Sequence, residues 1–281
     1  MKKTKKLSLL LIVAIAILLS ACHKDCKDDK LTQREVSITD KIKGIIIEGP
    51  WDVTITQDSA NNKATLEYCV SVENKIKSEL LSNGYLRIRI SSTGNSNCRT
   101  YRATINAALL EKIEASGAAT IRTYGIFNSH SDISLSGASK INGLVCKGDY
   151  ARLTLSGASK LENFTFTGNS MEATLSGASV LKFSNVDISS YCTVAASGAS
   201  TLNGSGYASK TTFTGSGAST FKTLSLESEN LDIELSGAST AEATVNNSIK
   251  GKLTGASILR YQKATNVNVD VEGGSKLIRI D

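Results

Sequence analysis

The stretch LSGASK occurs twice, at Leu135–Lys140 and Leu155–Lys160, and near-copies of it recur along the rest of the chain. The glycine of the motif returns every 18 to 21 residues, at Gly117, Gly137, Gly157, Gly177, Gly198, Gly217, Gly237, Gly255 and Gly273. Nine copies at so tight a period are typical of a solenoid, in which each repeat forms one rung of a stack.

Apolar residues mark the inside of each rung. The residue two before the glycine is mostly leucine, as in Leu135, and the residue four after it is mostly leucine or isoleucine, as in Ile141. Stretches such as residues 266–271 alternate apolar and polar residues, which indicates strands. The sequence therefore predicts an all-β fold, a parallel β-helix of about 20-residue rungs. Nine rungs stacked at about 4.8 Å would form a rod on the order of 43 Å long.

The glycine marks the corner of each rung, because glycine readily adopts the positive φ that a tight corner requires. We expect the alanine after it to fill the narrow interior of the turn. The flanking serines, such as Ser156 and Ser159, are expected to form mostly solvated columns that bond to the backbone or to each other. The alternative is that this hydroxyl stripe binds a ligand, such as a glycan or ordered water.

The N-terminal residues have the pattern of a secretory signal followed by a lipid-attachment motif. Four lysines precede an apolar run at residues 7–19, which is too short to span a bilayer. Residues 19–22, LSAC, resemble the lipobox of bacterial lipoproteins, in which cleavage before the cysteine leaves it to carry acyl chains. We therefore expect removal of the signal peptide, residues 1–21, and lipid attachment to a membrane at Cys22.

Composition and charge argue against a nucleic-acid partner. The chain is 41% hydrophobic and 21% charged, which is a globular composition. Its formal net charge of +6 falls to +2 once the four lysines of the signal are removed. Nucleic-acid binding normally requires a basic stripe. Because the mature chain is nearly neutral, we predict no nucleic-acid partner.

The part before the repeats divides into a tether and a cap. Residues 22–41 are charged and are predicted to be a flexible tether. Within residues 42–110, Gly49, Pro50 and Val53 match the glycine, alanine and inward positions of a divergent first rung. Residues 64–90 are predicted to form a strand, a polar run with a short helix as one interpretation, a turn and a strand, and they are placed to cap the exposed end of the solenoid. Residues 111–281 then form the repeat β-helix, in one domain with 42–110.

Lipidation of Cys22 leaves five of the six cysteines, so they cannot all be paired. Export permits disulfides, and Cys69 and Cys98, both before the repeats, are the pair that we expect to be joined. Cys146 and Cys192 are out of phase with the glycines and are expected to be buried apolar side chains. The cluster at residues 22–26, CHKDC, lacks the spacing of a haem or metal motif.

Several segments together resemble a known family. These are the lipobox, EGPWDVTITQ at Glu48–Gln57, NGYLRIRI at Asn83–Ile90 and the serial SGAS copies. They resemble the family of the putative auto-transporter adhesin, head GIN domain, over about residues 42–281. The resemblance implies a right-handed parallel β-helix and an adhesive role, and it carries over no catalytic residues. Residues 27–29, Lys-Asp-Asp, also resemble signals that send some lipoproteins to the cell surface.

The chain offers few residues for catalysis. Of its two histidines, His23 lies in the tether, and serines are too common around His130 to infer a Ser-His-Asp arrangement. Lys140 and Lys160 share a column, but no carboxylate column accompanies them. Nucleotide fingerprints and calcium-binding repeats are absent from the sequence. We therefore predict no catalytic residues, no metal and no cofactor.

The outward residues five after each glycine vary along the chain, as in Asn142, Glu162, Lys182, Asn203 and Lys222. Such a mixed polar face suits multivalent display rather than turnover. The sequence predicts an exported lipoprotein, anchored to the outer membrane and facing the periplasm or the cell surface. Its β-helix would bind a glycan, or an envelope or host surface partner. A polysaccharide lyase or hydrolase and a purely structural envelope component are the alternatives.

Overall fold

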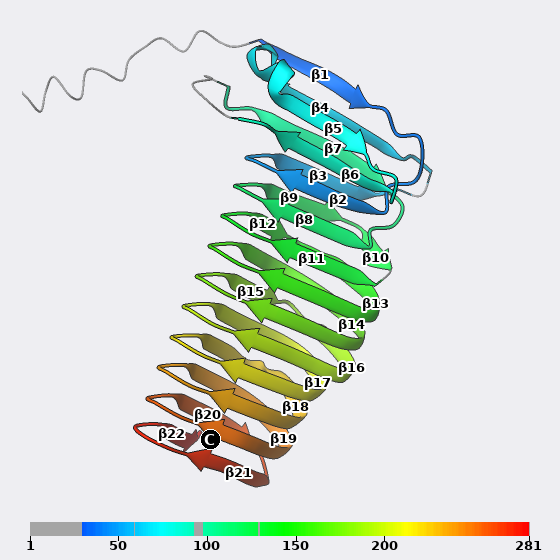
Figure 1. Cartoon of the computed structure of the whole chain (residues 1–281). Helices are drawn as coiled ribbons and strands as arrows, with labels where there is room; N and C mark the ends of the chain where they lie inside the picture. The colour runs from blue at the N-terminus through cyan, green and yellow to red at the C-terminus, as the bar shows by residue number, and fades with distance from the viewer. Residues whose placement is uncertain (1–29, 59, 93–97, 129, 281) are drawn as a thin grey trace, which may run out of the picture.

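The structure, a computed structural model, describes residues 30–58, 60–92, 98–128 and 130–280. The signal peptide and Cys22 lie outside these residues. The chain forms a long stack of parallel rungs with an antiparallel region at the N-terminal end (Figure 1). This arrangement confirms the predicted parallel β-solenoid.

The elements follow each other in chain order. The N-terminal part contains β1 (Leu31–Val36), β2 (Gly44–Glu48), β3 (Asp52–Gln57), β4 (Lys63–Cys69), the 3-10 helix η1 (Val70–Lys75), β5 (Ile76–Leu80), β6 (Tyr85–Ile90) and β7 (Tyr101–Ala107). The first repeats contain β8 (Lys112–Ser116), β9 (Thr120–Tyr124), β10 (Ile126–Asn128), β11 (Ser131–Leu135), β12 (Lys140–Asn142), β13 (Val145–Leu155), β14 (Lys160–Leu175) and β15 (Val180–Phe183). The remaining repeats contain β16 (Val186–Ala196), β17 (Thr201–Gly215), β18 (Thr220–Leu235), β19 (Thr240–Leu253), β20 (Ile258–Lys263), β21 (Asn266–Val271) and β22 (Lys276–Arg279).

Each rung has two kinds of corner. The first is the motif corner, where Gly157 separates β13 from β14. The second is a bend inside the long strands: β13 pairs with β10 through Val145 and with β11 through Ala151, and its inward alternation is interrupted between them. Lys140 pairs with Lys160, so successive rungs are in register at the 20-residue offset that the sequence predicts.

The motif glycines stack directly on one another. Gly157 has a φ of +70°, and a Cβ placed on it would lie 2.6 Å from the carbonyl oxygen of Gly137. Beside it, the backbone N–H of Ala158 donates to that same oxygen at 2.7 Å. Glycine is therefore required twice here, for the left-handed backbone and for the close approach of the neighbouring rung. Gly49 lies beneath Gly117 in the same column, as expected for a divergent first rung.

The side chains after the glycine lie the opposite way from our expectation. Ala158 is exposed at the corner, whereas Ser159 is completely buried. The prediction of a solvated Ser159 was wrong because Gly157 and Ala158 together form the outward corner, after which the chain turns back and places the second serine inside. There the hydroxyl of Ser159 donates to the carbonyl oxygen of Leu135 at 3.3 Å. Only a small side chain fits this vertex, and the first repeat carries Ala119 in the same place.

This buried column yields a matched pair of mutations. Ser159→Ala should lower the free energy of unfolding by about 1 kcal/mol, because it removes a buried hydrogen bond. Ser179→Ala should be neutral or slightly stabilising, because the Ser179 hydroxyl is buried without a hydrogen-bond partner. Urea denaturation of both variants tests this. A larger loss for Ser179→Ala than for Ser159→Ala would contradict the assignment.

The interior of the stack is filled with side chains. Phe164 stacks against Phe166, with ring centroids 6.4 Å apart, and the Phe213 and Phe221 rings are 5.0 Å apart. Gly215 makes room for the latter pair, since a Cβ there would lie 2.9 Å from the Phe221 ring. The hollow beneath Ile113 and Phe127 measures only about 10 Å³. A ligand would therefore bind on the surface of the solenoid rather than in its interior.

Cys146 and Cys192 are both buried, as predicted. Burial raises the pKa of the Cys146 thiol to about 11 and that of Cys192 to about 12. Both thiols therefore stay protonated at neutral pH, and thiols of this kind are poor nucleophiles.

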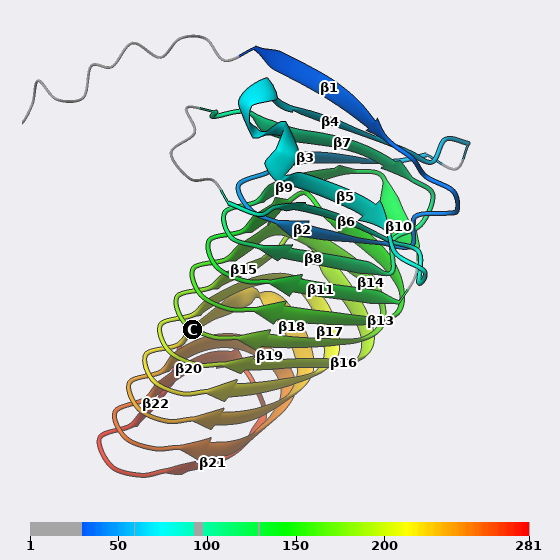
Figure 2. The same cartoon turned by 45° about the horizontal axis from the view of Figure 1, so that its top comes forward.

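The inserted residues build the N-terminal end of the stack (Figure 2). β6 pairs in parallel with β2, and β7 pairs in parallel with β3, which adds a rung ahead of the first one. Antiparallel strands then extend both sheets: β5 pairs with β6, and β4 pairs with β7. We call β1, β4–β7 and η1 the cap.

Part of the predicted tether belongs to the cap. Leu31–Val36 form β1, which pairs antiparallel with β4 from Leu31 opposite Cys69 to Val36 opposite Ala64. The prediction of a flexible tether over residues 22–41 was therefore wrong for this strand. These residues form a strand because β4 would otherwise expose an unpaired edge, and β1 covers that edge. In the described part of the chain, no helix is long and apolar enough to cross a membrane.

Candidate functional site

A strip of outward side chains runs along the bend inside the long strands. Tyr150 pairs with Ser170, Ser170 with Tyr191, and Tyr191 with Lys210, so these four residues occupy one position in consecutive rungs. We call them the tyrosine strip. Tyr191 is 57% exposed. The two tyrosines are two rungs apart, or about 10 Å at the usual spacing of strands.

Neighbouring side chains hold the rings of the strip in place. His130 stacks on Tyr150 with centroids 4.9 Å apart, and the Arg152 guanidinium lies 5.6 Å from the centre of the same ring. The Tyr150 hydroxyl donates to Glu172. Burial, together with this bond to Glu172, raises the pKa of Tyr150, so its hydroxyl stays protonated. The Lys210 ammonium lies 5.9 Å from the centre of the Tyr191 ring. Tyr191 is nevertheless an exposed residue, so its ring provides the exposed aromatic surface of the strip.

A polar ladder borders the strip. The Asn169 amide donates to the Asp149 carboxylate at 3.2 Å, and the Ser189 hydroxyl donates to the Asn169 carbonyl oxygen at 2.9 Å. These hydrogen bonds orient exposed donors and acceptors from three consecutive rungs. The surface therefore combines an exposed aromatic face with ordered polar groups, a combination that is common in binding sites.

The face after the motif corner carries a charge ladder instead. Glu162 lies between Lys140 and Lys182, and its carboxylate is 3.0 Å from the Lys182 ammonium. Hydrogen bonds from these two lysines lower the pKa of Glu162 to about 2. The register brings Asn142 and Glu162 together, and likewise Lys182, Asn203 and Lys222. Since the Glu162 carboxylate is shared by both ammonium groups, this part of the face presents paired charges with an excess of one positive charge rather than a free acid.

The outer hydroxyl column before each glycine bonds to the backbone. Ser197 Oγ donates to Leu175 O at 3.4 Å, and Ser236 Oγ donates to Gly215 O at 3.3 Å. These contacts favour the structural interpretation of the serines over a ligand-binding stripe.

The residues considered for catalysis are dispersed. His130 contacts Tyr150, while Asp132 faces the Lys112 ammonium at 4.0 Å. Lys140 and Lys160 are neighbours in register, and Lys140 is paired with Glu162. His23 lies outside the described residues. Within the residues that the structure describes, no three His, Cys, Asp or Glu side chains gather to hold a metal ion.

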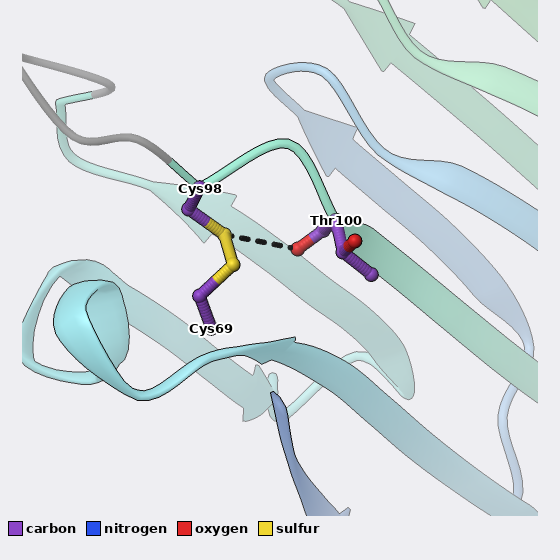
Figure 3. The surroundings of a disulfide bond; sticks show 3 residues. All are labelled: Cys69, Cys98 and Thr100. Atoms are coloured by element: carbon purple, nitrogen blue, oxygen red, sulfur yellow. Dashed lines mark hydrogen bonds between the residues drawn. A yellow bond between two sulfur atoms is a disulfide. The ribbon is translucent and has the colours of Figure 1, made fainter. Parts of the chain in front are cut away.

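A disulfide joins Cys69 and Cys98 within the cap (Figure 3). Cys69 ends β4, and Cys98 precedes β7, with the two Cα atoms 5.6 Å apart. Sγ of Cys98 also lies 3.3 Å from the carbonyl oxygen of Thr100. The bond ties η1 and β5, together with β6, into one closed loop at the end of the solenoid.

The tyrosine strip is not visible in the spacing of the motif glycines. Tyr150 and Ser170 each follow a motif glycine by 13 residues, but Tyr191 follows one by 14 and Lys210 by 12. Register shifts at the bend, between Gly168 and Ser170 and between Ile188 and Tyr191, absorb these differences. Aligning the repeats on the glycine alone therefore scatters the column, and aligning them on the next inward residue, such as Ala151 or Met171, would have shown it.

Comparisons with known proteins agree with the fold. No protein of curated function matches the chain in sequence. A putative lipid binding protein from Parabacteroides distasonis has a similar structure, with a TM-score of 0.65 and 13% identity over 90% of this chain and 98% of that one. Putative adhesins from Parabacteroides merdae and Parabacteroides distasonis have TM-scores of 0.57 and 0.56, with 15% and 17% identity and the same coverage.

The family assignment comes from the sequence rather than from these distant structures. The model of one family matches residues 42–191 and 189–264, which include β2–β7, the motif corners from Gly117 to Gly255 and the tyrosine strip. The chain therefore belongs to the family of the putative auto-transporter adhesin, head GIN domain.

Proposed function

We propose that this protein is an exported lipoprotein, anchored through Cys22 to the outer membrane, whose solenoid binds glycans as an adhesin. The observation that carries the proposal is the tyrosine strip with its polar ladder. Export and anchoring rest on the signal and the LSAC motif at residues 19–22. The family and the putative adhesins of similar fold support the adhesive role.

The chemistry of the strip suits a sugar chain. The face of an aromatic ring is electron-rich and apolar, so it packs against the C–H face of a pyranose while adjacent polar groups bond its hydroxyls. Tyr191 supplies the ring, Ser189 supplies a hydroxyl from the same strand, and Asn169 supplies an amide one rung away. The spacing of about 10 Å between the tyrosines is comparable to the length of a disaccharide.

The proposal predicts multivalent binding of modest affinity per site. Tyr191→Ala should weaken the retention of the arrayed protein on its glycan by about tenfold, because exposed aromatic residues dominate such contacts. Tyr124→Ala is the matched control, since Tyr124 is also 57% exposed but lies on another face of the solenoid. Retention on a panel of bacterial and host polysaccharides measures both. Equal retention of wild type and Tyr191→Ala would refute the role of the strip.

The same panel separates adhesion from its alternatives. A polysaccharide lyase or hydrolase would release new unsaturated or reducing ends, and an essential histidine would make His130→Ala inactive. A purely structural component would be retained on none of the polysaccharides. We expect retention without cleavage, and His130→Ala should produce no change in released ends.

The anchor has its own test. Cys22→Ser should shift the protein from the membrane fraction to a soluble or unprocessed form, because no acyl chain can be attached to serine at this position. Acyl labelling and membrane fractionation measure the change, and protease treatment of intact cells tests surface display. Unchanged acyl labelling of Cys22→Ser would show that the lipid is attached to another residue.

A further inference from the structure

The cap contains an open hollow of about 380 Å³ that is separate from the tyrosine strip. It is lined by Arg34, Ile76, Lys77, Ser78, Glu79 and Arg89. Arg34 comes from β1, the first strand after the N-terminal segment, and the others come from β5 and β6. The hollow therefore lies where the strands that extend the two sheets meet.

Three of its lining residues are cations without an acidic partner. Among the described residues, the ion pairs of the cap include Arg87 with Glu48 and Arg102 with Glu67, but none that contains Arg34, Lys77 or Arg89. Nε of Arg89 is buried and has no hydrogen-bond partner. Glu79 is the one acid of the lining, and it lies opposite Arg87 in the β5–β6 register. The hollow thus carries an excess of positive charge and an unused buried donor.

The arrangement of these cations is unfavourable without a ligand. Lys77 and Arg89 lie directly opposite each other in the antiparallel pair of β5 and β6. Like charges in this position destabilise a sheet. A bound anion would remove the repulsion, so the same residues that weaken the empty cap would favour the loaded one.

Arg34 is held in place across the hollow. Its Nη2 donates to the Ser78 hydroxyl at 3.0 Å, and its guanidinium lies 5.7 Å from the centre of the Tyr68 ring. The remaining N–H groups of the fork are therefore pre-oriented, which lowers the entropic cost of binding. Guanidinium forks match the geometry of tetrahedral oxyanions, and an ammonium adds a third charge.

We propose that this hollow, formed by Arg34, Lys77 and Arg89, binds a phosphate group. The phosphate belongs to a lipid headgroup or to free phosphate, and both present the same oxyanion. The hollow lies close in sequence to the membrane anchor, because Arg34 is twelve residues after the predicted lipid-attachment site at Cys22. A lipid phosphate bound here would dock the cap against the membrane surface.

Calorimetric titration of the purified chain in an uncharged detergent tests the site. The probes are inorganic phosphate and glycerophosphoglycerol, the water-soluble headgroup of a phosphodiester lipid. We expect binding that Lys77→Gln and Arg89→Gln each weaken by about tenfold, as for the loss of one charge-assisted hydrogen bond. Tighter binding of the diester identifies a lipid headgroup as the ligand, and equal or weaker binding of the diester identifies free phosphate.

Lys222→Gln is the control, because Lys222 is an exposed lysine of the repeat region without an ion pair in the described structure. Lys77 is itself exposed, so Lys77→Gln tests the site without disturbing the fold. Absence of binding to both probes, or equal weakening by Lys222→Gln, overturns the proposal. The glycan assay is independent: Lys77→Gln should be retained like wild type, and Tyr191→Ala should bind phosphate like wild type.

Discussion

Replacing Gly177 with alanine is expected to lower the free energy of unfolding by about 3 kcal/mol. Gly177 has a φ of +69°, a conformation that costs a residue with a Cβ about 1–2 kcal/mol. The new Cβ would also lie 2.6 Å from the carbonyl oxygen of Gly157, which is backbone and cannot move without shifting the rung. Such overpacking typically costs a further ~1–3 kcal/mol.

Gly143→Ala separates the two contributions. Gly143 has a φ of +85°, but the nearest atom to a Cβ there is the Thr123 oxygen at 3.7 Å. This variant therefore carries the backbone strain alone and should lose only about 1–2 kcal/mol. Urea denaturation of both variants and of wild type gives the comparison. Equal losses at the two positions would mean that the stacking of the motif corners contributes nothing to the requirement for glycine.

Loss of the disulfide between Cys69 and Cys98 should have an effect of similar size. The bond closes a loop with a sequence separation of 29 residues. Constraining a loop of this length in the unfolded chain corresponds to about 3–4 kcal/mol. The double variant Cys69→Ser/Cys98→Ser should lose this stability chiefly in the cap, because the repeat rungs hold one another through their own ladder bonds.

Hydrogen exchange locates the effect of the disulfide. Amides of β4–β7 should exchange faster in the double variant, whereas those of β17 and β18 should keep their protection. Cys192→Ala is the control for loss of a thiol, and a reductant should destabilise wild type but not the double variant. If full reduction of wild type left the exchange of the cap unchanged, the disulfide would be dispensable for its stability.

The local pattern of the sequence was enough to predict the repeat architecture. Strand alternation and the recurring glycine depend on neighbouring residues, so Leu135, Ile141 and Gly137 could be placed from their own surroundings. The prediction for Ser159 was wrong about the direction in which its side chain points. The alanine was expected inside the turn and the serine outside it, whereas Ala158 is exposed at the corner and Ser159 is buried.

The cap and the tyrosine strip depended on contacts that the sequence does not display. β1 is a strand because β4 offers it an edge, although its own residues, LTQREV, suit a solvated segment equally well. Tyr150 and Tyr191 form one column because the bend absorbs unequal repeat lengths. Motif spacing alone was thus sufficient for the solenoid, whose rungs repeat a local geometry. Only the tertiary structure decided which surface residues meet, because that depends on register between strands distant in the chain.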